Sequence, residues 1–139
     1  ADFETVVEKA ELYSRHTHVV FALSSFNNLV KNGRMSKIVG FVANKLGFWG
    51  IGIGSEQGTI EIKQKIRGSK KALDAIIEDM KERGYNCGKV VISHCRNAEF
   101  AESVKSAIQS VWDKAEVKIV RARGLCSYYA EKGGLIIGF

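Results

Sequence analysis

Apolar runs of strand length alternate with amphipathic helical patterns through the second half of the chain, and this order constrains the fold most. Residues 69–84 and 97–112 carry apolar side chains at helical spacing, and Ser69 and Asn97 stand where helix caps are expected. The apolar runs around these segments have the length of buried strands: 89–94, 115–122 and 135–139. Strands that alternate with helices predict an α/β domain built on a mixed sheet.

The first half of the chain predicts further strands, one of which alternates cleanly. Residues 18–23 form a buried apolar run, and 51–54 with 59–66 are expected to pair as a hairpin across Gln57-Gly58. Within 59–66, one face is expected to carry Ile60, Ile62 and Ile66, and the other Glu61, Lys63 and Lys65. Such a half-solvated strand favours a two-layer sandwich, an α/β (α+β) fold whose mixed sheet has helices packed mainly on one face.

Three helical segments are expected around the first strand. Residues 2–15 have apolar side chains at helical spacing. A short helix after Ser24 or Ser25 is expected to end at Gly33 in a left-handed cap. Residues 37–46 are apolar nearly all round, so that helix is expected to be buried on more than one side, by its own fold or by another domain.

Composition argues against several classes of protein. The 139 residues favour one domain, 1–139, and they contain no apolar run of about 20 residues, so no membrane span is expected. The net charge of +6 is spread among acidic residues without a block of like charge, which argues against nucleic-acid binding. Three cysteines without a CxxC pair favour a reducing, cytoplasmic setting. The spacing of Cys87, His94 and Cys95 matches no common zinc pattern, so neither a metal nor a cofactor is expected.

The sequence contains no convincing catalytic constellation. His94 ends an expected strand, but no nucleophile is positioned beside it, and Ser24-Ser25 does not lie in a G-x-S-x-G elbow. The glycines at 50, 52 and 54 lack the following helix of a phosphate-binding loop, so close approach of another backbone or a ligand explains them better. The chain is therefore not expected to be an enzyme, although a small-molecule enzyme using His94 or Tyr129 stays open as an alternative.

Arg34 is the strongest candidate for ligand binding. It follows Gly33 at a bend between two expected helices, where a guanidinium and a helix start together favour a carboxylate or a phosphate. On spacing alone, a surface arginine that pairs with a helix C-terminus is an equally weighted alternative. The neighbouring sequence supplies more apolar surface than one helix needs: Met35, Ile38, Phe48, Trp49 and Ile51. A cation that binds an anionic head group, beside an apolar groove, is the arrangement expected of a site for a fatty acid.

Five stretches, in order along the chain, resemble the DegV family. FALSSFNNLVKNGRMSK (21–37) resembles the family's strand, short helix and Gly-Gly-Arg-(Ile/Met)-Ser corner, with Asn32 in place of the first glycine. KIRGSKKAL (65–73) looks like its Lys-Val-Arg-x-x-Lys-Lys-Ala motif, and VVISHCRNAEFAESVKSAI (90–108) is similar to its Ile-x-His strand and following helix. The other two are LGFWGIGIGSEQGTI (46–60), with Trp49-Gly50 for the family's Lys-Pro, and GLCSYYAEKGGLIIGF (124–139).

The resemblance implies the C-terminal domain of a two-domain cytoplasmic bacterial protein, with the N-terminal domain absent from this chain. Family members bind a long-chain fatty acid between the domains, and some present it to a fatty-acid kinase, so the acid, the kinase and the missing domain are the expected partners. The implied position of Arg34 is near the carboxylate. The other expected ligand-binding residues are Met35, Ile38, Trp49, Ile51 and Tyr129, and the expected partner-binding residues are Arg67 and Lys70.

Two departures from the family pattern fall in the last stretch. Tyr129 stands where many members carry a histidine, and Glu131-Lys132-Gly133 replaces a Gly-Pro-Gly. A tyrosine hydroxyl still donates a hydrogen bond, so a role for Tyr129 at the head group is retained as an expectation. The alternative to a lipid-binding domain is a basic protein–protein interaction module without lipid binding.

Overall fold

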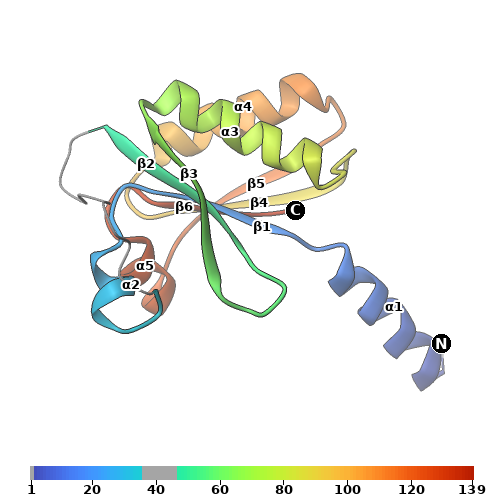
Figure 1. Ribbon diagram of the computed structural model, residues 1–139. Helices are drawn as coiled ribbons and strands as arrows, with labels where there is room; N and C mark the ends of the chain where they lie inside the picture. The colour runs from blue at the N-terminus through green and yellow to red at the C-terminus, as the bar shows by residue number, and fades with distance from the viewer. Residues whose placement is uncertain (1, 36–46) are drawn as a thin grey trace.

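The computed structural model describes residues 2–35 and 47–139, which form a six-stranded sheet with strand order β3-β2-β1-β6-β4-β5 (Figure 1). The strands are β1 (Val19–Leu23), β2 (Phe48–Gly54), β3 (Ile60–Arg67), β4 (Lys89–His94), β5 (Glu116–Arg121) and β6 (Leu135–Gly138). Neighbouring strands are antiparallel except β4 and β5, which are parallel. The predicted mixed sheet and the hairpin of β2 and β3 are therefore confirmed, whereas the helix expected over 37–46 lies outside the described residues.

Four of the five described helices divide between the two faces of the sheet, and the first, α1 (Phe3–Arg15), projects away from it (Figure 1). The other four are α2 (Asn27–Lys31), α3 (Ser69–Glu82), α4 (Ala98–Val111) and α5 (Gly124–Ala130). Figure 1 shows α3 and α4 side by side over one face, with α2 and α5 together beyond the opposite face at one end. The predicted two-layer arrangement is thus confirmed, and α2 with α5 adds partial cover to the second face.

The main core lies between the sheet and the α3–α4 layer. Ala72, Ile76 and Met80 repeat every four residues along α3, so they share one face of that helix, and all three are fully buried. The fully buried side chains that meet them are Val20, Val90, Ile92, Val104, Ile108, Leu135 and Ile137. Each such aliphatic side chain contributes about 1.5–3 kcal/mol by leaving water, so this layer supplies most of the apolar stabilisation of the fold.

The second face of the sheet carries a smaller apolar cluster, which we call the second cluster. Its buried members are Phe21, Leu23, Phe26, Leu29 and Ala130. Half-buried side chains surround them: Met35, Ile60, Ile62, Cys95, Tyr129 and Ile136. Because β1 alternates, Phe21 and Leu23 face this cluster while Val20 and Ala22 face the main core. The short helices α2 and α5 leave the second cluster only partly covered.

A β-bulge in β3 corrects one sequence prediction. Ile60 and Ile62 belong to the second cluster, but Ile66 packs against the main core on the opposite face. The register explains the change: Ile51 pairs with Gln64 and Gly52 pairs with Ile62, so Lys63 is an extra residue in β3. One inserted residue shifts the two-residue period, which turns every later side chain to the other face. The expectation that the three isoleucines share one face was wrong.

The predicted helix caps are also corrected at two positions. Gly68, with φ +93°, is the N-cap of α3, and Ser69 is the first helical residue. Asn97 does occupy the N-cap position of α4, but its side chain makes no cap bond. Its amide Nδ2 instead donates to the carbonyl oxygen of Gly133 at 2.8 Å, because the 131–134 turn lies beside it. Both helices therefore begin without a side-chain cap.

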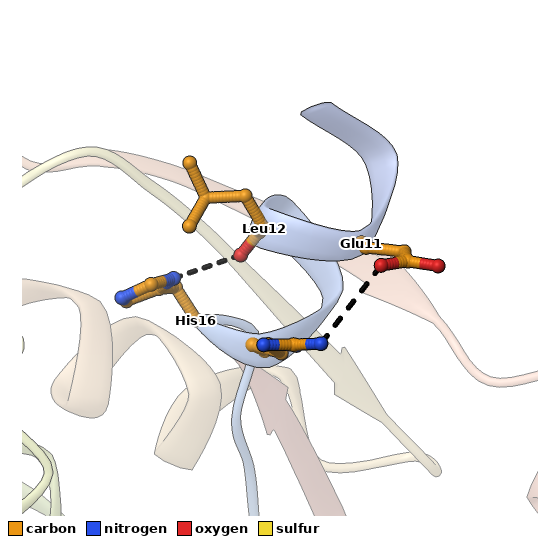
Figure 2. A network of polar contacts seen from close by, with 4 residues as sticks. Glu11, Leu12 and His16 are labelled. Atoms are coloured by element: carbon orange, nitrogen blue, oxygen red, sulfur yellow. Dashed lines mark hydrogen bonds and ion pairs between the residues drawn. The ribbon is translucent and has the colours of Figure 1, made fainter. Parts of the chain in front are cut away.

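Helix α1 projects away from the sheet and buries none of its residues in the described part of the chain (Figure 1). Asp2 caps it by accepting from the Thr5 N–H at 2.8 Å, and this bond lowers the pKa of the Asp2 carboxyl. At its other end, His16 Nδ1 lies 2.8 Å from the Leu12 carbonyl oxygen and an Arg15–Glu11 ion pair spans 3.8 Å (Figure 2). The apolar residues Phe3 and Tyr13 remain 80% and 71% exposed. The helix is therefore held by local contacts, and its apolar stripe is free.

Candidate functional site

Two glycines of β2 let aromatic rings lie directly on the second face of the sheet. A Cβ atom at Gly50 would overlap the ring of Phe26, and one at Gly52 would overlap both the Phe21 ring and the carbonyl oxygen of Glu61. Only a strand without side chains at these positions leaves space for the rings. The glycines therefore serve close approach of neighbouring groups, as the sequence favoured, and the rings form the floor of the second cluster.

Arg34 follows the C-terminus of α2 and precedes Met35, which packs against the second cluster. The Gly33 N–H donates to the Val30 carbonyl and the Arg34 N–H donates to the Leu29 carbonyl, at 3.1 and 2.9 Å. With Gly33 at φ +66°, these bonds form a Schellman motif, so the predicted left-handed glycine cap is confirmed. The Arg34 side chain is exposed and has no hydrogen bond or ion pair within residues 2–35 and 47–139. The alternative in which it pairs with a helix C-terminus is not seen there.

The other predicted ligand-binding residues divide between the two faces. Met35 and Tyr129 are half-buried and meet in the second cluster, next to Arg34 in the chain and on α5 respectively. Trp49 and Ile51 instead face the main core: Trp49 packs on Phe100 with ring centroids 4.7 Å apart, and Ile51 is 2% exposed. Ile38 lies outside the described residues. Their roles in binding stay predictions; the structure brings Met35 and Tyr129 together on one side of the sheet, and Arg34 precedes Met35 in the chain.

A carboxylate that the sequence analysis did not single out holds α2 in place. Glu131 Oε1 accepts from the Asn28 N–H at 2.8 Å, and Glu131 Oε2 accepts from the Ser25 hydroxyl at 2.5 Å. Asn28 lies in the first turn of α2, so a residue about 100 positions away in the chain caps this helix. The expected cap, Ser24 or Ser25, is thus corrected: Phe26 occupies the N-cap position, and the Ser25 hydroxyl donates to the Glu131 carboxylate while it accepts from the Asn27 N–H at a long 3.5 Å. A negative charge at a helix N-terminus is stabilising because the exposed N–H groups there are positive.

Asparagine side chains complete the connection between α2 and α5. Asn28 Nδ2 donates to the Tyr128 carbonyl oxygen at 2.8 Å, and Asn32 Nδ2 donates to the Tyr128 hydroxyl at 2.9 Å. Glu131 itself has φ +53°, a left-handed conformation that glycine adopts more easily. This position falls where the resembling family motif has a glycine. The sequence feature that could have indicated the capping of α2 was therefore Glu131, an acidic residue where the resembling family motif has a glycine.

Changing Glu131 to glutamine is expected to lower the free energy of unfolding by about 1 kcal/mol, because a charge-assisted cap becomes a neutral one. Urea denaturation followed by circular dichroism measures the change. Glu102→Gln is the matched control, since Glu102 is exposed on α4 and makes no side-chain hydrogen bond or ion pair with any described residue. Equal effects of the two substitutions would contradict the capping role.

The predicted partner-binding residues lie at the junction of β3 and α3. Arg67 and Lys70 are both exposed, and the Arg67 guanidinium lies 5.7 Å from the centroid of the Phe48 ring. A cation over an aromatic face is held in place without losing its charge. The arrangement leaves a positive surface at this junction, and its use by a partner stays a prediction.

His94 and Tyr129 do not form a catalytic pair in the described part of the chain. His94 is 7% exposed, and its Nδ1 accepts from the Asn97 N–H at 3.1 Å. No hydrogen bond joins either side chain to a serine, threonine or cysteine hydroxyl or thiol among these residues. In the same ranges, no three His, Cys, Asp or Glu side chains gather as metal ligands, and no helix has the length and apolar character to cross a membrane.

Comparison with known proteins identifies a family and similar sequences that match nearly the whole chain. A family model described as an uncharacterised protein of the DegV family matches residues 1–139. A DegV domain-containing protein of Streptococcus pyogenes serotype M3 is 44% identical over 137 residues, which are 99% of this chain and 49% of that protein.

Solved structures give matches over the whole described fold. A fatty acid kinase (Fak) B3 protein of Streptococcus pneumoniae, described as loaded with linoleic acid, has a TM-score of 0.93 and 40% identity, covering 100% of this chain and 50% of that one. A DegV family protein of Eubacterium eligens, described as loaded with heptadecanoic acid, has a TM-score of 0.93 and 37% identity, covering 99% and 50%. The chain therefore spans about half the length of the relatives that it matches.

Proposed function

This chain belongs to the DegV family, and on that premise we propose that it binds a long-chain fatty acid as one wall of a site completed by a second domain. The observation that carries the proposal is the match to two structures loaded with C17 and C18 acids, each at a TM-score of 0.93 over almost the whole chain. Because both relatives are twice as long as this chain, the second wall is assigned to a domain like their other half. The proposed role needs no catalytic group in this chain.

The second cluster supports an acyl-chain wall in this proposal. Its floor is the pair of rings Phe21 and Phe26, and half-buried apolar side chains surround that floor. A half-covered apolar surface is costly in water and gains free energy when an alkyl chain or another domain covers it. Met35 and Tyr129 are the proposed contacts of the ligand on this side.

Arg34 is proposed to hold the carboxylate of the acid. Its guanidinium makes no ion pair with any described residue, and Met35 next to it enters the second cluster. A guanidinium binds a carboxylate through charge-assisted hydrogen bonds. Trp49 and Ile51 are then proposed to support the site only indirectly. Their side chains pack in the main core, on the face of the sheet opposite the second cluster.

Presentation of the acid to a kinase is the proposed biological use, in a cytoplasmic setting. One structural relative is described as a fatty acid kinase (Fak) B3 protein loaded with linoleic acid, and this description supports the proposed use. Arg67 and Lys70 are the proposed contact with such a partner, because they form an exposed positive surface away from the second cluster. The phosphoryl transfer itself is assigned to the kinase.

Native mass spectrometry of the whole protein that contains this chain, purified from a bacterial host, tests the proposal. We expect a co-purified C14–C18 acid. Arg34→Gln is expected to lower its occupancy or affinity about tenfold or more, because hydrogen bonds to charged groups contribute about 1.5–3 kcal/mol. Lys31→Gln is the matched control, since Lys31 is an exposed cation at the end of α2, three residues before Arg34. A ligand-free protein whose Arg67→Glu change abolishes a partner contact would favour the protein-interaction module instead.

A further inference from the structure

A pocket lies at the carboxyl ends of the two parallel strands, and it borders the second cluster at Cys95. It measures about 860 Å³, and its lining includes His94, Arg96, Ala98, Arg121, Tyr128 and Lys132. His94 and Arg121 end β4 and β5 and are partners in the register. Val90 and Ile92 in β4, like Val117 and Ile119 in β5, face the main core, so strand alternation turns both final side chains to the α4 side. Ligands of α/β sheets commonly bind at this edge.

The charges around this pocket are all positive. Arg96, Arg121 and Lys132 are exposed, and none of them forms an ion pair or side-chain hydrogen bond with the described residues. No aspartate or glutamate belongs to the lining. Two acids are close in sequence to lining residues, and neither belongs to the described lining: Glu131 is next to Lys132 but its carboxylate is bound by Ser25 and Asn28, and Glu99 lies in the first turn of α4. Three cations that line one pocket without a carboxylate in the described lining repel one another, and an anion bound among them would offset this repulsion.

His94 adds a buried donor that opens into the pocket. It is 7% exposed, and its Nδ1 accepts the Asn97 N–H, so the neutral ring carries its proton on Nε2. No described residue pairs with Nε2, and that atom is not sealed from solvent. Because His94 lines the pocket, this N–H is available to a ligand there.

The first turn of α4 supplies further donors beside the same pocket. Helix α4 is 14 residues long and starts at Ala98, which is part of the lining. The Asn97 side chain is turned to the Gly133 carbonyl and does not cap the helix, so its first N–H groups have no side-chain acceptor. Uncapped N–H groups at a helix start attract anions.

We propose that this pocket binds a phosphate group, present either as free phosphate or as the end of a phosphorylated metabolite. A phosphate carries about two negative charges and three acceptor oxygens at neutral pH, which suits three cations and a neutral N–H better than a single carboxylate does. The phosphate site uses groups other than the proposed acyl contacts, because His94 and Arg121 face the α4 side of the sheet whereas Met35 and Tyr129 face the other, and Cys95 is the one described residue that the lining shares with the second cluster. It therefore neither requires nor excludes fatty-acid binding.

Titration of the 139-residue chain with inorganic phosphate and with pyrophosphate, followed by ¹H–¹⁵N NMR, tests the site. We expect saturable shifts of the His94 Nε2–H and of the Ala98 and Glu99 amides. The double variant Arg121→Gln/Lys132→Gln is expected to lose about tenfold or more in affinity, since charge-assisted contacts dominate phosphate binding. Lys89→Gln/Lys118→Gln is the matched control, because it removes the same charge from exposed positions on β4 and β5, outside the lining.

The outcomes separate the proposal from general attraction to a basic chain. Loss of phosphate affinity in Arg121→Gln/Lys132→Gln but not in the control supports the site. Adenosine 5′-monophosphate is then compared with inorganic phosphate: tighter binding of the monophosphate would identify a phosphate ester as the ligand, and equal binding would identify free phosphate. Shifts spread over the whole surface, or equal losses in both double variants, overturn the proposal. Circular dichroism of each variant checks that the fold is kept, so that a loss reports on the pocket.

Discussion

Gly52→Ala is expected to destabilise the fold by about 3 kcal/mol, the upper part of the range for adding a methyl group to a tightly packed interior. The new Cβ would overlap the Phe21 ring and the carbonyl oxygen of Glu61 in the paired strand. A ring can rotate or shift, but the carbonyl belongs to the hydrogen-bonded ladder of β2 and β3, so the strands themselves would have to separate. Urea denaturation of the purified chain measures the loss as a lower transition midpoint.

Gly54→Ala provides the matched control on the same strand. A Cβ atom at Gly54 would have no atom within 4 Å, and the residue has no positive φ that would oppose a side chain. Alanine there is expected to be neutral, or stabilising by about 0.4–1 kcal/mol, because it restricts the unfolded chain. If the two variants unfold at the same urea concentration, the close approach of Phe21 and Glu61 does not limit this position.

The 139-residue chain alone is expected to bind palmitate no tighter than about 0.1 mM, whereas a protein that also contains the proposed second domain is expected to bind at least about a thousandfold tighter. Burying about 14 methylenes is worth at most roughly 11 kcal/mol at about 0.8 kcal/mol each. If this chain covers one side, about half of that remains, and about 5.5 kcal/mol corresponds to a dissociation constant near 0.1 mM before the cost of immobilising the ligand.

Isothermal titration of the chain and of the whole protein with palmitate measures this difference. Laurate, which has about four fewer methylenes, is the matched control and is expected to bind the whole protein less tightly than palmitate, because each buried methylene contributes. Submicromolar binding of palmitate by this chain alone would contradict the shared-wall proposal, since it would mean that one domain encloses the acyl chain.

Local patterns account for the parts of the fold that were predicted correctly. The buried strands and the helices α3 and α4 follow from side-chain periods of two and of about 3.6 residues, which depend on neighbours in sequence. The glycine cap at Gly33 follows from its freedom to take a positive φ. These features need no knowledge of what lies across the sheet, and for this reason the α/β class and the hairpin were accessible from the sequence.

The candidate site was predicted less completely, because its geometry depends on which face each strand presents. Trp49 and Ile51 lie close to Met35 in sequence, yet they belong to the main core, whereas Met35 enters the second cluster. Glu131 was missed as a capping group because its partners Ser25 and Asn28 are more than 100 residues away. No local pattern marks such a contact before the chain has folded.

The sequence by itself determined the order of the strands and of helices α1 to α4, the resemblance to a fatty-acid-binding family and the position of Arg34 after a capping glycine, whereas helix α5 was not predicted. Only the tertiary structure decided which apolar residues share a face, since one bulge at Lys63 reverses the phase of β3 and sends Ile66 to the side opposite Ile62. Likewise, only folding brings His94, Arg121 and Lys132 to one pocket. The physical reason is the same for both: periodicity is encoded between neighbours, whereas register and long-range charge contacts depend on the packing of segments distant in the chain.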